Sequence, residues 1–154
     1  MSAADRGRAA FSAAPERAYV VEKQIGHLLR RAHQRATAIF MAELGDRFQI
    51  TPTQYAALVK LHDLGEQSQN QLGRLTAMDP ATIQGVIRRL EDRALIERAG
   101  DPGDRRRTRL RLSAQGKDLV VQMIEHGVRV SEATLAPLDD AERTRFLALL
   151  ERLI

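Results

Sequence analysis

The sequence predicts a mainly α-helical protein that carries one two-stranded β-hairpin. Aromatic residues make up only 4% of the 154 residues and tryptophan is absent, as is typical of helical rather than sheet proteins. Apolar residues recur at 3.6-residue spacing over most of the chain. The exception is segment 95–112, where two short extended runs flank the turn-forming sequence Gly100-Asp-Pro-Gly103.

The length fits one domain, or a small domain with dimerisation arms, because single cores form at roughly 100 to 200 residues. The chain has no cysteine, which excludes disulfides, thiolate metal sites and cysteine nucleophiles. We find no signal-like segment and no run approaching the roughly 18 apolar residues of a membrane span. We therefore expect a cytoplasmic protein without a membrane partner.

The N-terminal part is expected to hold a flexible arm and one long helix. Residues 1–16 are Ala-rich and charged and are assigned to the arm. From about Tyr19 to Leu44 the apolar residues follow helical spacing, and Gly45 is expected to end this helix. Residues 17–48 are therefore interpreted as a dimerisation helix.

Three shorter helices follow, each with its own start signal. Thr51-Pro-Thr-Gln54 forms a capping box for a helix that is expected to run to about Leu64 and stop at Gly65. Ser68-Gln-Asn-Gln71 repeats this signature for a short third helix. Asp79-Pro80 opens a fourth helix that reaches about Arg93.

The hairpin is predicted from Leu95 to Ala99 and from Thr108 to Leu112. Ser113 then caps a long fifth helix, and Asp139, with Glu142 three residues later, begins the sixth. The resulting order of six helices plus a hairpin places a winged helix-turn-helix domain at residues 49–113. The helices of residues 114–154 and the first helix have no partner sheet, so we expect them to bury their apolar stripes in a homodimer.

The fourth helix has a face suited to double-stranded DNA. Ile83, Val86, Ile87 and Leu90 share one side and are assigned to the core. The opposite side and its shoulders carry small and polar residues, namely Ala81, Thr82, Gln84, Gly85, Arg88 and Arg89. Glutamine can bond adenine, arginine can bond guanine or phosphate, and small residues permit close approach. An ordinary solvated face remains the alternative for this helix taken alone.

The hairpin favours the DNA interpretation, because residues 104–111 hold five arginines against one aspartate. Arg105, Arg106 and Arg107 are expected to enter a minor groove or neutralise phosphates. Asp104 is expected to pair with a nearby arginine and hold the shape of the hairpin. Ser68, at the start of the third helix, is a candidate contact to the DNA backbone.

These segments resemble the MarR-type transcriptional regulators. Asp104-x-Arg106 followed after five residues by Leu112-Ser113 is similar to the family's wing signature Asp-x-Arg-x5-Leu-Thr, with Ser in place of Thr. Residues 78–98 resemble the family's recognition helix and first wing strand, and the resemblance extends over roughly residues 20–154. Gly85 stands where many relatives carry a larger polar residue, so the resemblance does not imply a preferred DNA sequence.

The resemblance implies a symmetric homodimer that binds a pseudo-palindromic operator and commonly represses a neighbouring operon. It also implies release from DNA when a small phenolic or aromatic carboxylate effector binds between the dimer helices and the DNA reader. The candidate ligand residues are Arg31, His33, Thr37, Tyr55, Leu58 and His62. Core histidines bonded to backbone carbonyls are the alternative for His33 and for His62, which we place on the apolar face of its helix.

His27 and His126 are interpreted as surface or interface residues, and no histidine has zinc-type spacing to another ligand. We therefore expect no metal and no cofactor. No nucleophile beside a base, phosphate loop or carboxylate pair is recognisable, so an enzyme is not expected. The function predicted is a ligand-responsive dimeric repressor; the alternative is a regulator or nucleoid-type DNA binder without an effector.

Overall fold

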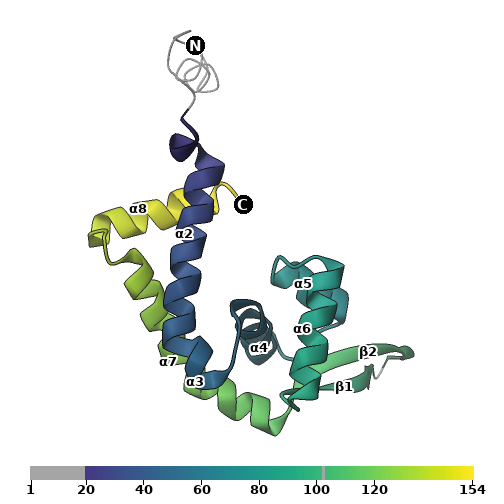
Figure 1. Ribbon diagram of the computed structural model, residues 1–154. Helices are drawn as coiled ribbons and strands as arrows, with labels where there is room; N and C mark the ends of the chain where they lie inside the picture. The colour runs from purple at the N-terminus through teal and green to yellow at the C-terminus, as the bar shows by residue number, and fades with distance from the viewer. Residues whose placement is uncertain (1–19, 102) are drawn as a thin grey trace, which may run out of the picture. The chain divides into compact units, whose positions relative to one another are not determined.

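The computed structural model describes residues 20–101 and 103–154 of the protein. It is mainly helical and carries one antiparallel hairpin, as predicted (Figure 1). The elements in chain order are η1 (Val21–Lys23), α2 (Ile25–Phe40), the π-helical turn η2 (Met41–Gly45), α3 (Asp46–Phe48), α4 (Pro52–Leu64), α5 (Gln69–Leu75), α6 (Pro80–Asp92), β1 (Ile96–Asp101), β2 (Asp104–Leu112), α7 (Ala114–Leu135) and α8 (Asp140–Glu151). The arm predicted for residues 1–16 lies outside the described residues.

The chain divides into two compact units, residues 1–33 and residues 34–154. In the first unit, the beginning of α2 exposes the apolar side chains of Ile25, Leu28 and Leu29. The second unit contains the end of α2 and every element after it. None of the helices described is both long and apolar enough to cross a membrane.

The prediction that Gly45 ends the first helix is wrong. Gly45 keeps right-handed helical angles (φ −58°, ψ −54°), and the helix widens into the π turn η2 before continuing as α3. The backbone leaves the helix only at Gln49, which is left-handed (φ 54°) and whose side chain donates a 2.9 Å hydrogen bond to the Asp46 carbonyl. Gly45 is buried, and a Cβ atom there would meet the flexible end of the Met41 side chain, so this glycine lies inside the helix and does not terminate it.

The helix starts predicted from capping residues are confirmed. Thr51 and Gln54 form a reciprocal capping box, in which the Gln54 amide donates to Thr51 Oγ1 and the Thr51 amide donates to Gln54 Oε1. The side chains of Ser68, Asp79 and Ser113 each accept from an amide in the first turn of their helix. These bonds satisfy amides that have no partner within the helix, which fixes where α5, α6 and α7 begin.

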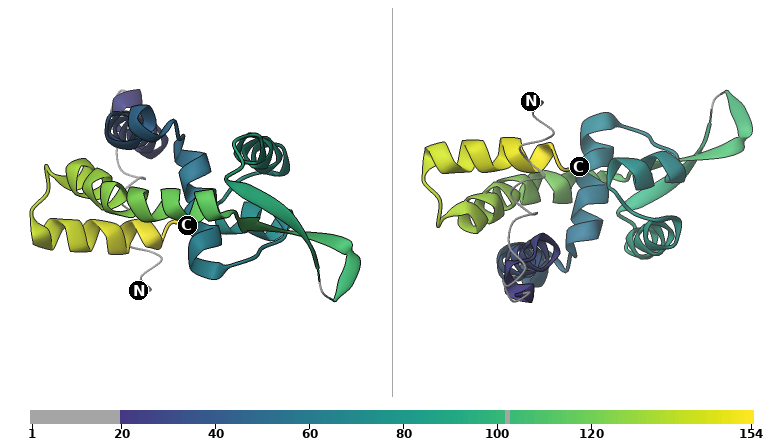
Figure 2. Two further views of the ribbon diagram at one scale, coloured as in Figure 1. Left: turned by 90° about the horizontal axis from the view of Figure 1, so that it is seen from below. Right: turned by 90° about the horizontal axis from the view of Figure 1, so that it is seen from above.

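The hairpin is longer than predicted. Its strands pair from Ile96 opposite Leu112 to Gly100 opposite Thr108, and after an irregularity at Gly100 and Asp101 a last pair joins Asp101 to Asp104. Gly100 and Asp101, which were assigned to the turn, therefore belong to the ladder. Figure 2 shows the hairpin reaching out beyond the helices that flank it.

A single hydrophobic core lies beneath helices α4, α5 and α6 and the base of the hairpin. Its fully buried members include Leu58 of α4, Leu72 of α5, Ile87 of α6 and Leu110 of β2. Leu44 of η2, Ile50, and Val120 and Met123 of α7 belong to the same core. The expected boundaries near residues 48 and 113 are thus not breaks in packing, because both flanking helices share the core of the reader.

Candidate nucleic-acid interface

Helix α6 has the two faces that its sequence predicts. Ile83, Val86, Ile87 and Leu90 are all at most 2% exposed. At the N-terminus, Asp79 Oδ1 accepts from the Thr82 amide at 2.9 Å and Oδ2 accepts from the Thr82 hydroxyl at 2.7 Å. These hydrogen bonds lower the pKa of the Asp79 carboxyl, so the cap is ionised at neutral pH and fixes the first turn.

The outward face of α6 is open to solvent. Ala81, Thr82, Gln84, Arg88 and Arg89 are exposed, and Gly85 is half-buried among them. A Cβ atom at position 85 would have only the far end of the Arg89 side chain near it, at 3.7 Å from Nη1. The rest of the protein therefore has no steric need for glycine at this position, and the space beside it remains free for another molecule.

The wing is attached to α6 by polar contacts at its base. The guanidinium of Arg98 in β1 donates to both carboxylate oxygens of Glu91 in α6, at 2.6 and 3.3 Å. Ser113 Oγ donates a 2.7 Å bond to the carbonyl of Ala94, in the turn between α6 and β1. These bonds fix the base of the hairpin to the C-terminal end of α6.

The arginines of β2 have different surroundings. Arg111 Nε donates to Glu97 Oε1 across the hairpin at 2.9 Å, and its Nη1 lies 3.8 Å from Glu66 Oε1. Two carboxylates thus already neutralise Arg111. Residues 105–107 lie in β2, but their side chains are outside what the structure describes. Asp104 begins β2 and is half-buried, and its pairing with an arginine stays a prediction.

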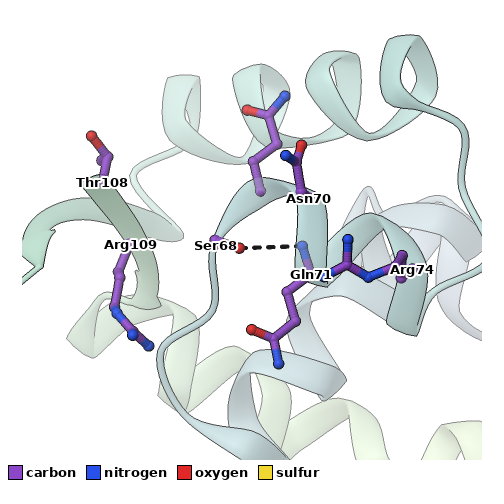
Figure 3. Close-up of a pocket in the computed structure, with 7 residues that line it drawn as sticks. Ser68, Asn70, Gln71, Arg74, Thr108 and Arg109 are labelled. Atoms are coloured by element: carbon purple, nitrogen blue, oxygen red, sulfur yellow. Dashed lines mark hydrogen bonds between the residues drawn. The ribbon is translucent and has the colours of Figure 1, made fainter. Parts of the chain in front are cut away.

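A polar depression of about 520 Å³ lies where the start of α5 faces the base of β2 (Figure 3). The residues that line it are Ser68, Gln69, Asn70, Gln71, Arg74, Thr108 and Arg109. The segment before α5 is fixed to β2 by an isolated bridge, in which Gln67 and Leu110 exchange hydrogen bonds of 3.1 and 2.8 Å. Of the residues that line the depression, only Ser68 was predicted from the sequence as a DNA contact, because local patterns do not reveal the pairing of Gln67 with Leu110.

The residues considered for an effector have very different environments. Arg31 and His33 are exposed on α2, and Thr37, further along that helix, is half-buried. On α4, Leu58 is fully buried in the core. Tyr55 packs edge-on against Phe40, with ring centroids 5.5 Å apart, and burial raises the pKa of its phenol, so its hydroxyl remains a hydrogen-bond donor at neutral pH.

The expected place of His62 on the apolar face of α4 is corrected by the structure, because its side chain is exposed. Leu61, the residue before it, provides the core contact in this last turn and is 3% exposed. His62 instead lines an open cavity of about 440 Å³ with neighbours that include Glu66, Arg111 and Lys117. The alternative of a core histidine is thereby removed for His62.

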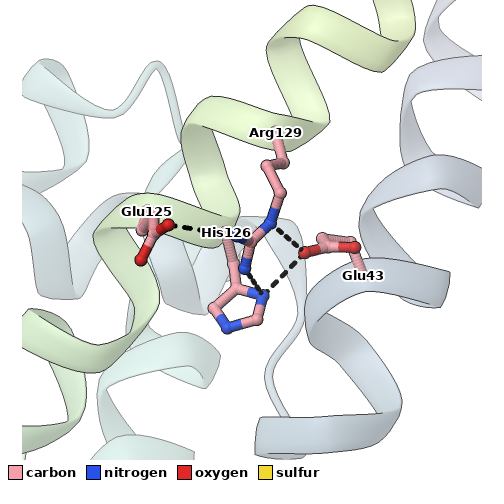
Figure 4. Close-up of polar contacts among 4 residues, drawn as sticks. All are labelled: Glu43, Glu125, His126 and Arg129. Atoms are coloured by element: carbon pink, nitrogen blue, oxygen red, sulfur yellow. Dashed lines mark hydrogen bonds and ion pairs between the residues drawn. The ribbon is translucent and has the colours of Figure 1, made fainter.

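His126, predicted to be a surface or interface residue, is largely covered by its own chain, and whether it also lies at an interface stays a prediction. Its side chain is 13% exposed, and Nδ1 lies 2.7 Å from Glu43 Oε1 (Figure 4). Arg129 Nε donates to the same carboxylate oxygen at 2.7 Å and Nη1 pairs with Glu125 at 3.2 Å. The contacts with Arg129 and His126 lower the pKa of the Glu43 carboxyl. No local sequence pattern indicates this cluster, because Glu43 lies 83 and 86 positions before its two partners.

Comparison with known proteins agrees with this architecture. Residues 50–108 match the model of the MarR family. The chain is 42% identical over 136 residues to the transcriptional repressor NicR of Pseudomonas putida, which covers 88% of this chain and 85% of NicR. NicR is a regulator of transcription and not an enzyme.

Two solved structures have the same fold. A probable transcriptional regulator from Pseudomonas aeruginosa is 45% identical with a TM-score of 0.84, covering 88% of this chain and all of that one (100%). BpsR of Bordetella bronchiseptica, whose DNA binding is regulated by 6-hydroxynicotinic acid, is 37% identical with a TM-score of 0.84, covering 89% and 97%. Together with the capped reader helix and its wing, these similarities establish that the chain belongs to the MarR family and is a DNA-binding regulator of transcription.

Proposed function

We propose that the protein is a homodimeric repressor that leaves its operator when a small aromatic carboxylate binds. The observation that carries the DNA part is the exposed polar face of α6, fixed through Arg98 and Glu91 to a hairpin whose second strand bears five arginines. A helix of this kind fits the major groove, while the wing reaches the adjacent minor groove or phosphates.

The individual roles follow from the chemistry of the exposed groups. Gln84 and Arg88 are assigned to base edges or phosphates, with Ala81 and Gly85 permitting close approach. Thr82, Arg89 and Ser68 are assigned to the DNA backbone, and Arg105, Arg106 and Arg107 to the wing contact. Asp104 is assigned to shaping the wing. The depression beside Ser68 adds Asn70 and Arg74 as further candidates for a phosphate.

Exposed apolar stripes support a dimer. Val121, Ile124 and Val128 recur on one side of α7 and are 40 to 64% exposed, and α8 exposes Phe146 and Leu149. Apolar surface of this extent is costly in water and is typical of an interface. We assign residues 17–48 and 114–154 to dimerisation and residues 49–113 to DNA. Val128→Glu should convert the dimer to a monomer in sedimentation and abolish tight operator binding.

The effector class is inferred from the relative BpsR, which responds to 6-hydroxynicotinic acid. A carboxylate and a ring hydroxyl match the donors among our candidates: the Arg31 guanidinium, the imidazoles of His33 and His62 and the Tyr55 phenol. Thr37 and the buried Leu58 are the remaining candidates, although Leu58 is reached only if the core opens. Bound ligand would act by changing the spacing of the two recognition helices.

The decisive experiment is a titration of the DNA upstream of the protein's own gene. If a dimer neutralises roughly 6 to 10 phosphates, its affinity should fall steeply with salt. Affinity that is flat between low and physiological salt would refute the wing assignment. Replacing Arg105 to Arg107 by Gln should weaken binding, and an equal loss on competitor DNA would favour the nucleoid-type alternative.

The effector arm uses 6-hydroxynicotinic acid and related aromatic acids as probes in the same titration. We expect release of the operator by at least one of them. His33→Ala and His62→Ala, tested separately, should leave operator affinity intact and reduce the response if the histidine binds the acid. Loss of operator affinity in equal measure would assign that histidine a structural role instead.

A further inference from the structure

Arg93 makes the longest-range polar contact of the reader helix. It lies at the C-terminal cap of α6, where its Nη1 donates to the Gln49 carbonyl at 2.5 Å and its Nη2 donates to the Phe48 carbonyl at 3.0 Å. These carbonyls belong to the point where the long N-terminal helix ends, 44 and 45 residues earlier in the chain. Terminal carbonyls lack partners inside their helix, and a guanidinium with two parallel donors satisfies both at once.

The segment that Arg93 holds is also fastened on another side. Glu43 in η2 accepts from Arg129 of α7 and lies 2.7 Å from His126 Nδ1 (Figure 4). The ring of Phe48 packs edge-on against His126, with centroids 5.3 Å apart. Residues 41–49 therefore bridge α7, which carries the expected dimer surface, to the end of α6, which carries the expected DNA surface.

Arg93 lies opposite Gln84, near the shoulder of α6 that carries Thr82 and Arg89, and its guanidinium is turned to another segment of the chain. On a helix of 100° per residue, position 93 lies roughly 180° from Gln84, and its guanidinium is bound to the main chain of another segment. Both Nη groups of Arg93 therefore already have hydrogen-bond partners inside the protein. It lies at the C-terminal cap of α6 and joins this end of the helix to residues 48 and 49.

We propose that Arg93 is a positioning residue that sets the pose of α6 relative to residues 41–49 and passes displacements of that segment to the recognition helix. The proposal rests on the proposed function, since it explains how a ligand that shifts the dimer helices changes DNA affinity. In this proposal, the two hydrogen bonds from Arg93 to main-chain carbonyls, and not a contact with DNA, link residues 41–49 to the recognition helix. A rigid link of this kind transmits small movements because packed segments change position together.

The test compares Arg93→Lys with the matched control Arg143→Lys. Lysine keeps the positive charge, but its single nitrogen lacks the fork that bridges two carbonyls. Arg143 also donates to two carbonyls, those of Leu135 at 3.1 Å and Leu138 at 2.9 Å, but it does so through Nε alone, and it lies on α8 and not on α6 or the hairpin. A purely structural role predicts the same behaviour for both variants.

We expect Arg93→Lys to weaken operator binding by roughly 2- to 30-fold and to reduce the fold-change caused by 6-hydroxynicotinic acid. The slope of log affinity against log salt should stay at the wild-type value, because no phosphate contact is lost. Because Arg143 lies in a segment assigned to dimerisation, both variants are compared at concentrations where sedimentation shows them to be dimeric; there Arg143→Lys should leave operator affinity unchanged. A salt slope reduced by about 0.9 would instead make Arg93 a phosphate contact and overturn the proposal.

Amide hydrogen exchange on the DNA-free protein tests the link between residues 41–49 and α6 without depending on the proposed function. In Arg93→Lys, exchange should increase in residues 41–49 and in α6 together, relative to Arg143→Lys. Unchanged protection of α6 would overturn the proposal even if operator binding falls. If the wild type binds no promoter fragment, the proposed function fails, while the exchange result still supports or refutes the link through Arg93.

Discussion

Gly116 of α7 lies directly against the main-chain carbonyl of Leu95, so that a Cβ atom at position 116 would overlap the carbonyl oxygen. The same carbonyl accepts a 3.1 Å hydrogen bond from the Ser113 amide. The first turn of α7 and the beginning of the wing therefore meet backbone to backbone. No side chain separates the two backbones at this point.

Gly116→Ala should consequently destabilise the protein by about 1–3 kcal/mol, the usual cost of overpacking, because a backbone and not a mobile side chain must move. Urea denaturation followed by circular dichroism measures this. Gly85→Ala is the matched control, since it is also helical and meets nothing closer than 3.7 Å. Equal stability of Gly116→Ala and the wild type would contradict the close approach.

Ser113 is the residue at which the chain departs from the wing signature, and it makes two hydrogen bonds. Its Oγ accepts from the Gly116 amide at 3.0 Å and donates to the Ala94 carbonyl at 2.7 Å. Ser113→Ala should cost about 1–2 kcal/mol of unfolding free energy, as for other lost caps. Ser113→Thr keeps the hydroxyl and should retain most of the unfolding free energy that Ser113→Ala loses. An equal loss in both variants would show that the hydroxyl does not provide this stability.

Replacing Gly85 should change the stability of the protein and its affinity for DNA in opposite directions. Since no other part of the protein fills the space beside it, Gly85→Ala should raise helix stability by up to about 1 kcal/mol. Affinity for the operator should fall by roughly 5- to 30-fold, because the added methyl group prevents close approach to DNA. Melting curves measure the change in stability, and gel-shift titrations measure the change in operator affinity. Undiminished operator affinity would mean that Gly85 is only a tolerated glycine on a solvated face.

The ion pair of Glu43 with Arg129 predicts a dependence of stability on pH. The folded-state pKa of Glu43 is lowered, so its contribution is present above the usual glutamate pKa of about 4.3 and is lost as the pH falls through the lowered value. Glu43→Gln should therefore melt below the wild type at neutral pH, and the difference should shrink in acid. A Glu151→Gln control, at the exposed end of α8, should show no such trend. A constant difference would argue against this ion pair.

Much of the reader was predictable from sequence because the signals are local. Capping residues such as Ser68 and Asp79 act on amides within one turn, and the inward side of α6 follows from helical spacing alone. The family resemblance likewise depends on contiguous motifs around Asp104 and Ser113. These features determine which elements form, where most of them begin and which side of the recognition helix is free.

The remaining features were decided by tertiary packing. Gly45 favours helix termination by propensity, yet it is buried and continues the helix through the π turn into α3. His62 is exposed where an apolar face was expected, and the His126 side chain is 13% exposed, since exposure depends on which helices pack against α4 and α7. The contacts of Arg93 and Glu43 join residues more than 40 positions apart, and a short sequence window contains no information about such pairs.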